Sequence, residues 1–476
     1  MKTSTTLAAG ALALALSPVL LAADDAEDSA TAGVQPAQMA QLPAAAAPNW
    51  FTYGGDLRLR YESFDHLPVG GPLGDYWSYF RFRTRVFAQV DYNDFTFNAR
   101  LVNEWRKLAN RHGRNSYPFS DELIFDQLYL EFRDIFNLPL KLRAGRQDLM
   151  LGSLRVLGEG TAGNGSRSFY FDALRLTYTP VEQLNIDLIG TYNRWYDPLA
   201  IGGLDDDIVR DHKRDLNGNR SDEAGAILYL TDQRSRELPY EAYYIWKHET
   251  TDARGSIAGG EGRDTHTFGG RLLPNFSSTL SGEFEAALQL GRTEDHRDIH
   301  AFMLYGGVTQ TFEPIASFTP YIGGAALMLS GDKSESSGHI SAWNPLWGRL
   351  PAFGDLSGMM YPGMSFWYQN LIYPHLELGF YNGKTKGKSK HYLRFQTGPM
   401  FAQYEDASDV ASNMAGDGAY RGWHFFTQYG VPLIKKPLGP LQDLTAMLEA
   451  DCLLPGDYFN ESSPIYFLRV QLLASF

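Results

Sequence analysis

The sequence predicts an all-β fold, a transmembrane antiparallel up-and-down β-barrel of about eighteen strands, on three observations. Segments in which apolar and polar residues alternate with period two follow one another from Phe51 to the end of the chain. The connectors between them are mostly short and long in turn, which is typical of barrels with tight turns at one end and long loops at the other. Phe (29), Tyr (27) and Gly (47) are abundant, yet mean hydropathy is only −0.29, as expected where half of each strand faces water.

The first 50 residues precede the predicted barrel. Residues 1–23 are predicted to be a secretory signal peptide, because Lys2 is followed by the apolar run Leu7–Leu21 and then by small residues. Residues 24–50 are acidic and then rich in Ala, Pro and Gln, and we expect a flexible periplasmic lead-in. No later stretch approaches the roughly 20 apolar residues of a spanning helix. We therefore expect residues 51–476 to form one outer-membrane barrel without a helical anchor.

The expected strands and connectors follow from the alternation of apolar runs and turn residues. Strands are expected to begin near residues 52, 76, 93, 122, 138, 169, 183, 223, 238, 264, 278, 298, 315, 374, 390, 420, 443 and 464. Short connectors are expected at 91–94, 134–139, 180–183, 232–237, 274–277 and 313–314, and long ones at 65–75, 107–121, 148–168, 196–222, 250–263, 331–363 and 405–419. A soluble sandwich gives no reason for such sorting, so the pattern favours the bacterial outer membrane, with long loops outside the cell.

The last stretch, Tyr466–Phe476, is the clearest strand. Tyr466, Leu468, Val470, Leu472, Ala474 and Phe476 fall on one face, and mostly polar residues fall on the other. A strand of this kind that ends on Phe is typical of the closing strand of outer-membrane barrels. The single cysteine, Cys452, excludes an intrachain disulfide and is predicted to lie on the lipid face as a small apolar residue.

Arginines alternate with apolar residues in several expected strands. In SYFRFRTRVFAQVDY, Arg81, Arg83 and Arg85 share one face. An arginine that faces lipid at mid-bilayer costs about 2–4 kcal/mol, so this face is predicted to line the lumen. The same reasoning places Arg58, Arg60, Arg143 and Arg394 in the lumen.

Two interpretations of these arginines remain open. They form a basic strip that attracts anions, or they pair with lumen carboxylates as ordinary parts of a polar barrel interior. The last hairpin illustrates the second interpretation: if its loop is centred near Phe459, Arg469 lies opposite Glu449, and Asp451 shares the lumen face with Glu449.

Short motifs in a fixed order resemble the alginate-export porin family of outer-membrane barrels. They are Gly145-Arg146-Gln147, Gly165-Ser166-Arg167, FDALR at 171–175 with Arg175, Ser330-Gly331-Asp332, Asn344-Pro345-Leu346-Trp347 and Pro455-Gly456-Asp457. The resemblance implies a monomeric barrel that passes an anionic uronate polymer or its fragments through an arginine-rich constriction, with Arg83 and Arg146 on matching motifs. Asp148, Glu449 and Asp451 depart from the family pattern, because more basic residues are expected there, and they dilute a purely cationic pore.

The sequence therefore predicts an outer-membrane channel, not an enzyme, that carries anionic sugars and needs no cofactor or metal. The predicted pore-lining or substrate-binding residues are Arg58, Arg60, Arg81, Arg83, Arg85, Arg143, Arg146, Asp148, Arg167, Arg175, Arg394, Glu449, Asp451 and Arg469. Its expected partners are outer-membrane lipid and an anionic oligosaccharide or polysaccharide. Nucleic acid is not expected, because the net charge is −13 and no basic patch is interleaved with aromatic residues.

Four alternatives stay open at this point. One is a general diffusion porin, and another is a secretion channel with periplasmic partners, in which residues 331–363 fold inward as a plug. A third is a structural barrel with a blocked lumen. The last is an outer-membrane hydrolase, although H-E-x-x-H, G-x-S-x-G and Walker A sequences are absent. Asp215-x-Asn217-x-Asn219 has the alternation of a calcium loop but lacks its glycine and closing glutamate, so a solvated loop is favoured.

Overall fold

The computed structural model describes residues 50–66, 76–109, 123–159, 171–194, 197–201, 221–251, 262–333, 338–348, 354, 369–383, 389–405, 416–460 and 462–476. The predicted signal peptide, the predicted lead-in up to residue 49, Arg167 and the Asp215–Asn219 stretch lie outside these residues. Within the described ranges, no helix has the length and apolar composition needed to cross a membrane.

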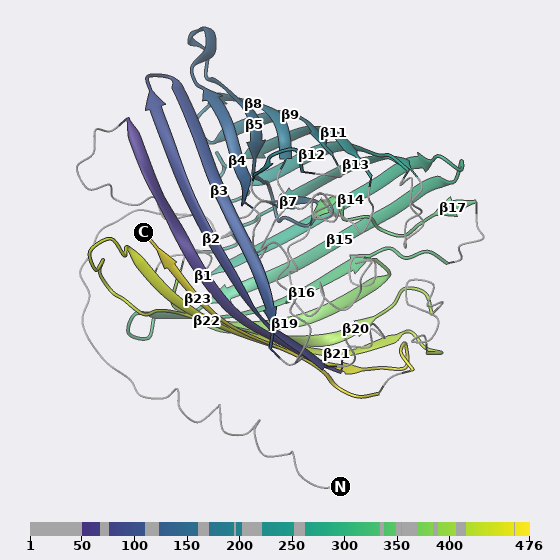
Figure 1. The fold of residues 1–476 in the computed structure, drawn as a ribbon. Coiled ribbons are helices and arrows are strands. Elements are labelled where there is room, and N and C mark those ends of the chain that lie inside the picture. Colours follow the sequence, from purple (N-terminus) through teal and green to yellow (C-terminus); the bar gives the residue numbers. More distant parts are fainter. Residues whose placement is uncertain are drawn as a thin grey trace. The chain divides into compact units, whose positions relative to one another are not determined.

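Eighteen long strands form the wall of the molecule (Figure 1). They are β1 (Phe51–Asp65), β2 (Tyr76–Tyr92), β3 (Phe95–Leu108), β4 (Leu123–Phe132), β5 (Leu140–Gln147), β8 (Phe171–Val181), β9 (Leu184–Asn193), β11 (Glu223–Asp232), β12 (Tyr240–Glu249), β13 (Arg263–Leu272), β14 (Leu280–Thr293), β15 (Asp298–Thr311), β16 (Phe318–Leu329), β19 (Leu371–Asn382), β20 (Tyr392–Phe401), β21 (Tyr420–Pro432), β22 (Asp443–Pro455) and β23 (Ile465–Ser475). The short elements are η1 (Ile135–Asn137), β6 (Leu149–Met150), β7 (Leu157–Glu159), β10 (Ala200–Ile201), β17 (His339–Ile340) and β18 (Trp347–Gly348).

The wall strands close into a barrel. Each pairs antiparallel with the wall strand that follows it in the chain, and β23 pairs with β1, with Val470 opposite Tyr61. Closure leaves no unpaired sheet edge, which is what allows strands to stand in lipid. Every wall strand begins within three residues of its expected start, and the last stretch of the chain is the closing strand, as predicted.

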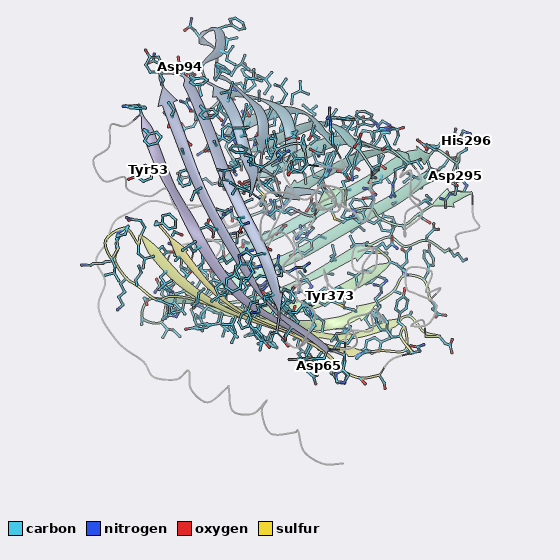
Figure 2. All side chains as sticks on the ribbon, viewed as in Figure 1. Tyr53, Asp65, Asp94, Asp295, His296 and Tyr373 are labelled. Atoms are coloured by element: carbon cyan, nitrogen blue, oxygen red, sulfur yellow. The ribbon has the colours of Figure 1, made fainter. Side chains whose placement is uncertain are left out.

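The connectors sort to the two ends of the barrel. At one end, here the short-connector end, β2 and β3 are joined by Asn93–Asp94 and β8 and β9 by Glu182–Gln183. Asn93 has φ 50°, a left-handed conformation that asparagine tolerates in tight hairpins. The opposite end, the long-connector end, carries the long connectors that the sequence predicted. Two connectors that it did not predict also lie there, the short residues 294–297 between β14 and β15 and residues 456–464 between β22 and β23. Figure 2 shows Asp94 at the short-connector end and Asp295 and His296 at the long-connector end.

Alternation along β1 separates an apolar outer face from a polar inner one. On β1, Leu57 is 49% exposed and Leu59 is exposed, whereas Arg58 and Arg60 are buried between them. Successive side chains of a strand point to opposite faces, so the buried arginines point inward. The arginines of β1 thus lie on the face opposite its exposed leucines, and the outer face offers apolar side chains to lipid.

Candidate functional site in the lumen

The first three strands carry a network of ion pairs on their inner faces. Asp56 accepts from two arginines of β2: its Oδ1 lies 3.1 Å from Arg83 Nη2 and its Oδ2 lies 2.6 Å from an Arg85 nitrogen. On the next step along the wall, Arg58 Nη2 lies 3.2 Å from Glu104 Oε2 of β3. These arginines are almost fully buried, so they interact mainly with the carboxylates beside them in the wall.

Arg81 is the accessible member of this network. Its Nη1 is 3.1 Å from Glu62 Oε2 and its Nε is 3.2 Å from Glu104 Oε1, while 14% of its side chain stays exposed. The network joins five arginines to three carboxylates, namely Arg58, Arg60, Arg81, Arg83 and Arg85 with Asp56, Glu62 and Glu104. Each of the five arginines therefore has a carboxylate partner in the wall.

The closing seam repeats this pairing. Glu449 lies opposite Arg469 in the β22–β23 register, as the sequence predicted, and their closest atoms are 3.5 Å apart. Arg469 Nη2 also lies 2.6 Å from Glu62 Oε1 of β1, so one guanidinium joins three strands across the seam. Asp451 is buried on the same inner face, and Cys452 follows it on the outer one.

Two arginines face each other directly on the inner wall of β5 and β8. Arg143 and Arg175 are register partners, so their Cβ atoms are about 4.5–5.5 Å apart by the geometry of paired strands. Like charges in such positions repel. Each guanidinium has a carboxylate on the far side from the other arginine: Glu131 of β4 lies 2.6 Å from Arg143, and Asp187 of β9 lies 2.8 Å from Arg175. The side chains of Arg143 and Arg175 remain 26% and 21% exposed. In this row of four charges the two arginines are adjacent, and part of each side chain is exposed.

Arg394 of β20 is a further accessible cation. Its Nε lies 2.7 Å from Glu377 Oε2 of β19, and its side chain is 26% exposed. Lys141 lies one step from Arg143 along the inward face of β5. The accessible basic side chains are thus distributed over separate sectors of the wall.

Arg146 differs from its predicted place. Arg146 is three residues from Arg143 on β5, and side chains an odd number of residues apart point to opposite faces of a strand. Arg146 therefore does not share the inward face with Arg143. Its side chain is buried and contacts Asp172 at 2.8 Å, Asp197 at 2.8 Å and the carbonyl oxygen of Phe125 at 2.9 Å. The period-two alternation of β5, counted from Arg143, decides the face on which the Arg146 side chain lies. The motif resemblance contains no information about that face.

Asp148 follows the end of β5 and turns back toward β3 and β4. Its Oδ2 accepts from Arg100 Nη2 at 3.2 Å and from Gln127 Nε2 at 2.7 Å. Burial raises the pKa of this carboxyl, and the nearby Arg100 opposes that rise. The acidic side chain that departs from the family pattern therefore lies beside another arginine of the inner wall.

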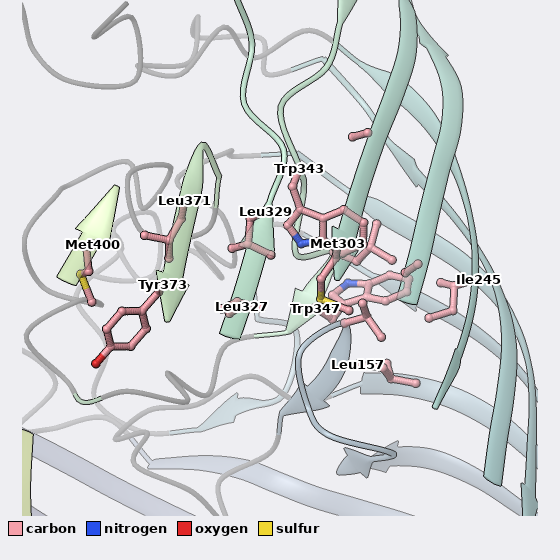
Figure 3. Close-up of a cluster of buried hydrophobic side chains, with 14 of the residues drawn as sticks. Leu157, Ile245, Met303, Leu327, Leu329, Trp343, Trp347, Leu371, Tyr373 and Met400 are labelled. Atoms are coloured by element: carbon pink, nitrogen blue, oxygen red, sulfur yellow. The ribbon is translucent and has the colours of Figure 1, made fainter. Parts of the chain in front are cut away.

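Two segments that follow wall strands fold into the barrel. The first holds β6 and β7, and the second, residues 338–348, holds β17 and β18; Trp347 of β18 pairs in parallel with Leu157 of β7. Trp343 and Trp347 are buried and pack among inward side chains of the wall such as Met303 (Figure 3). The described part of 331–363 thus folds inward, the arrangement that the sequence left as one of several alternatives.

Charged side chains fix the first inward segment. Arg155 Nη1 lies 2.7 Å from Glu283 Oε1 and 2.7 Å from Glu285 Oε2, both on β14. The guanidinium carbon of Arg155 also lies 3.5 Å from the ring centre of Tyr305. Burial opposes the charge of Arg155, but the two carboxylates outweigh it and raise the pKa of the guanidinium. Ser153 adds a hydrogen bond to Glu285 at 2.5 Å.

The second inward segment is held by backbone and ring contacts. Lys247 of β12 lies 2.8 Å from Glu223 and donates to the carbonyl oxygen of Leu346 at 3.2 Å. The Trp347 indole donates to Glu223 at 2.9 Å, and Gln289 donates to the carbonyl oxygen of Asn344 at 2.7 Å. The sequence predictions did not include these wall residues; the signal available was a polar side chain on the inward face of a strand.

Comparison with known proteins agrees with this architecture. The alginate export family model matches residues 49–381. Among solved structures, OccK3 (OpdO) of Pseudomonas aeruginosa is similar with 12% identity over 89% of this chain and 95% of that one, at a TM-score of 0.50. OpdK of the same organism, crystallised with vanillate, is similar with 12% identity over 89% of this chain and 98% of that one, also at 0.50. A search of curated protein sequences gives no match. The chain therefore belongs to the alginate-export family, as a channel-type β-barrel of the bacterial outer membrane.

Proposed function

We propose that this barrel passes anionic sugars, such as alginate or other uronate polymers and oligomers, and contacts them through the accessible arginines of its lumen. The observation that carries the proposal is the Arg143–Arg175 pair, two cations on facing positions of the inner wall with part of each side chain exposed. A wall lined by one sign of charge concentrates the opposite ion. The family match supports the same class of substrate.

The chemistry of the pair suits a uronate carboxylate. Each guanidinium has five N–H donors in a planar fork, which matches the two oxygens of a carboxylate. In the described contacts, Arg143 uses Nε and Nη2 for Glu131, and Arg175 uses Nε and Nη2 for Asp187. The Nη1 groups are then the donors that a passing sugar acid meets. Arg81 and Arg394 would serve as further contact points elsewhere on the wall.

Planar-bilayer recording tests the proposal. The double variant Arg143→Gln/Arg175→Gln should shift the reversal potential in a salt gradient toward cations and weaken block by uronate oligomers about tenfold or more, since one charge-assisted hydrogen bond is worth about 1.5–3 kcal/mol. Arg234→Gln is the matched control, because Arg234 pairs with Asp232 at the short-connector end, outside the lumen. Block that stays as strong in the double variant as in the wild type would refute the assignment.

The barrel is expected to survive this double substitution. Glu131 keeps Arg133 at 3.3 Å, and Asp187 keeps the hydroxyl of Thr177 as a donor. Neither carboxylate is left buried without a partner, so the variant changes the lumen charge more than the fold.

A general diffusion porin without substrate selectivity is the second candidate. The observation in its favour is the pairing of Arg58, Arg83 and Arg85 with carboxylates of the wall, which removes much of the basic character that the sequence suggested. In that case the wild-type channel passes current that uronate oligomers do not block. We propose no catalytic step, because the family and the fold are those of a channel. We also propose that one chain forms one pore, since β1 closes against β23 of the same chain.

A further inference from the structure

Asp298, His300 and His339 meet at the long-connector end, away from the lumen contacts. Asp298 and His300 are two residues apart on β15 and share the face opposite to Ile299, which is buried. β17 joins β15 by a two-residue parallel pairing that places His339 beside Asp298. The possible ligand atoms of the three side chains all lie within 4.8 Å of one another, and among the described residues no other such group of His, Cys, Asp or Glu occurs.

We propose that these three residues form a binding site for a divalent transition-metal ion such as Zn²⁺. Two imidazoles and one carboxylate suit zinc, nickel or copper, whereas calcium and magnesium prefer oxygen ligands alone. Ligand atoms about 2.0–2.1 Å from a tetrahedral ion are about 3.4 Å apart, so atoms that now lie within 4.8 Å of one another need to approach by at most about 1.4 Å. His300 and His339 are exposed and can rotate to do so. Water would fill the remaining coordination position.

Arg292 is the competitor for this site. Its Nε lies 2.9 Å from Asp298 Oδ1, but both side chains are well exposed. An exposed ion pair of this kind is worth about 0–1 kcal/mol, which a metal–carboxylate bond readily exceeds. The neighbouring Asp295 and Arg297 pair with each other at 2.7 Å.

The metal would fasten the second inward segment to the wall. His339 lies four residues before Trp343, which is buried in the barrel, and β17 otherwise holds to β15 through two paired residues. An ion shared by His300 and His339 adds a link between the wall and the start of the inward segment. This inference does not depend on which solute the channel carries.

Zinc binding to the purified barrel, prepared without a polyhistidine tag, tests the site. We expect one Zn²⁺ per chain in isothermal titration, little competition from Ca²⁺ or Mg²⁺, and an affinity about tenfold or more lower in His300→Ala or His339→Ala, since even outer-shell partners of metal ligands are worth about 10–100-fold. His296→Ala is the matched control: His296 is an exposed histidine of the connector that precedes β15, and it lies outside the cluster. Stoichiometry near zero, or equal loss of affinity in His296→Ala, would overturn the site.

Current recording tests the fastening separately. Zn²⁺ should reduce the frequency of current transitions in the wild-type channel and leave it unchanged in His339→Ala. If zinc binds with the expected stoichiometry but the transitions do not change, the metal site stands and the link to the inward segment is refuted. If uronate block is absent while zinc binds, only the proposed substrate fails.

Discussion

Arg155→Met should loosen the first inward segment, the one that holds β6 and β7. Arg155 spans from this segment to Glu283 and Glu285 of β14, more than 120 residues away in sequence, through two contacts of 2.7 Å. Methionine keeps most of the side-chain length and its packing on Tyr305 but has no donor. The substitution therefore tests the charge contacts rather than the volume.

The magnitude follows from what the two carboxylates retain. Removal of one partner of a buried ion pair costs about 3–5 kcal/mol. Glu283 keeps Arg271 at 3.1 Å, and Glu285 keeps the hydroxyl of Tyr243 at 3.0 Å, so the lower end applies. A loss of about 3 kcal/mol raises the equilibrium constant for release of the segment about 160-fold.

Single-channel recording measures this release. Arg155→Met should show more frequent current transitions and a higher maximal conductance than the wild type, because the segment no longer stays packed against β14. The control is Arg234→Met, which removes an exposed pair with Asp232 outside the lumen and should leave the recording unchanged. Identical traces for Arg155→Met and the wild type would show that the two glutamates do not hold the segment, and the reasoning would fail.

Three further outcomes are expected. Gly225→Ala should destabilise the barrel by about 1–3 kcal/mol in denaturant unfolding, because an added Cβ would lie 2.3 Å from the Trp347 ring; an unchanged midpoint would contradict this packing. Arg83→Gln should lower stability by about 3 kcal/mol, the lower end for a buried ion pair because Asp56 keeps Arg85, with little change in ion selectivity. A large selectivity change at constant stability would reverse that assignment. Burial raises the pKa of Asp148, so ionisation of this carboxyl lowers the stability of the fold above that pKa. Asp148 also loses its negative charge at a higher pH than an ordinary aspartate does. Anion preference should therefore rise as pH falls into the acid range, and Asp148→Asn should abolish that step in reversal-potential measurements.

The sequence determined the wall of the barrel. Period-two alternation places Arg58 and Leu57 on opposite faces of the strand, and the apolar face must be the one that meets lipid. A register slip of one residue would turn every arginine of the strand outward. The same local logic predicted that Glu449 lies opposite Arg469, since a hairpin loop fixes the register of its two strands. Strand count, closure and the sorting of connectors followed from the same signal.

Only the tertiary structure decided which inner groups meet. Arg155 contacts Glu283, and His300 lies beside His339, through the inward course of two connectors whose sequences carry no periodic signal. The motif that contains Arg146 names a residue without stating the face of the strand on which it lies, and the register of β5 supplies that face. Period-two alternation depends only on neighbouring residues along one strand. Contacts between distant parts of the chain depend also on the stagger of every strand pair around the barrel, which no single segment of sequence specifies.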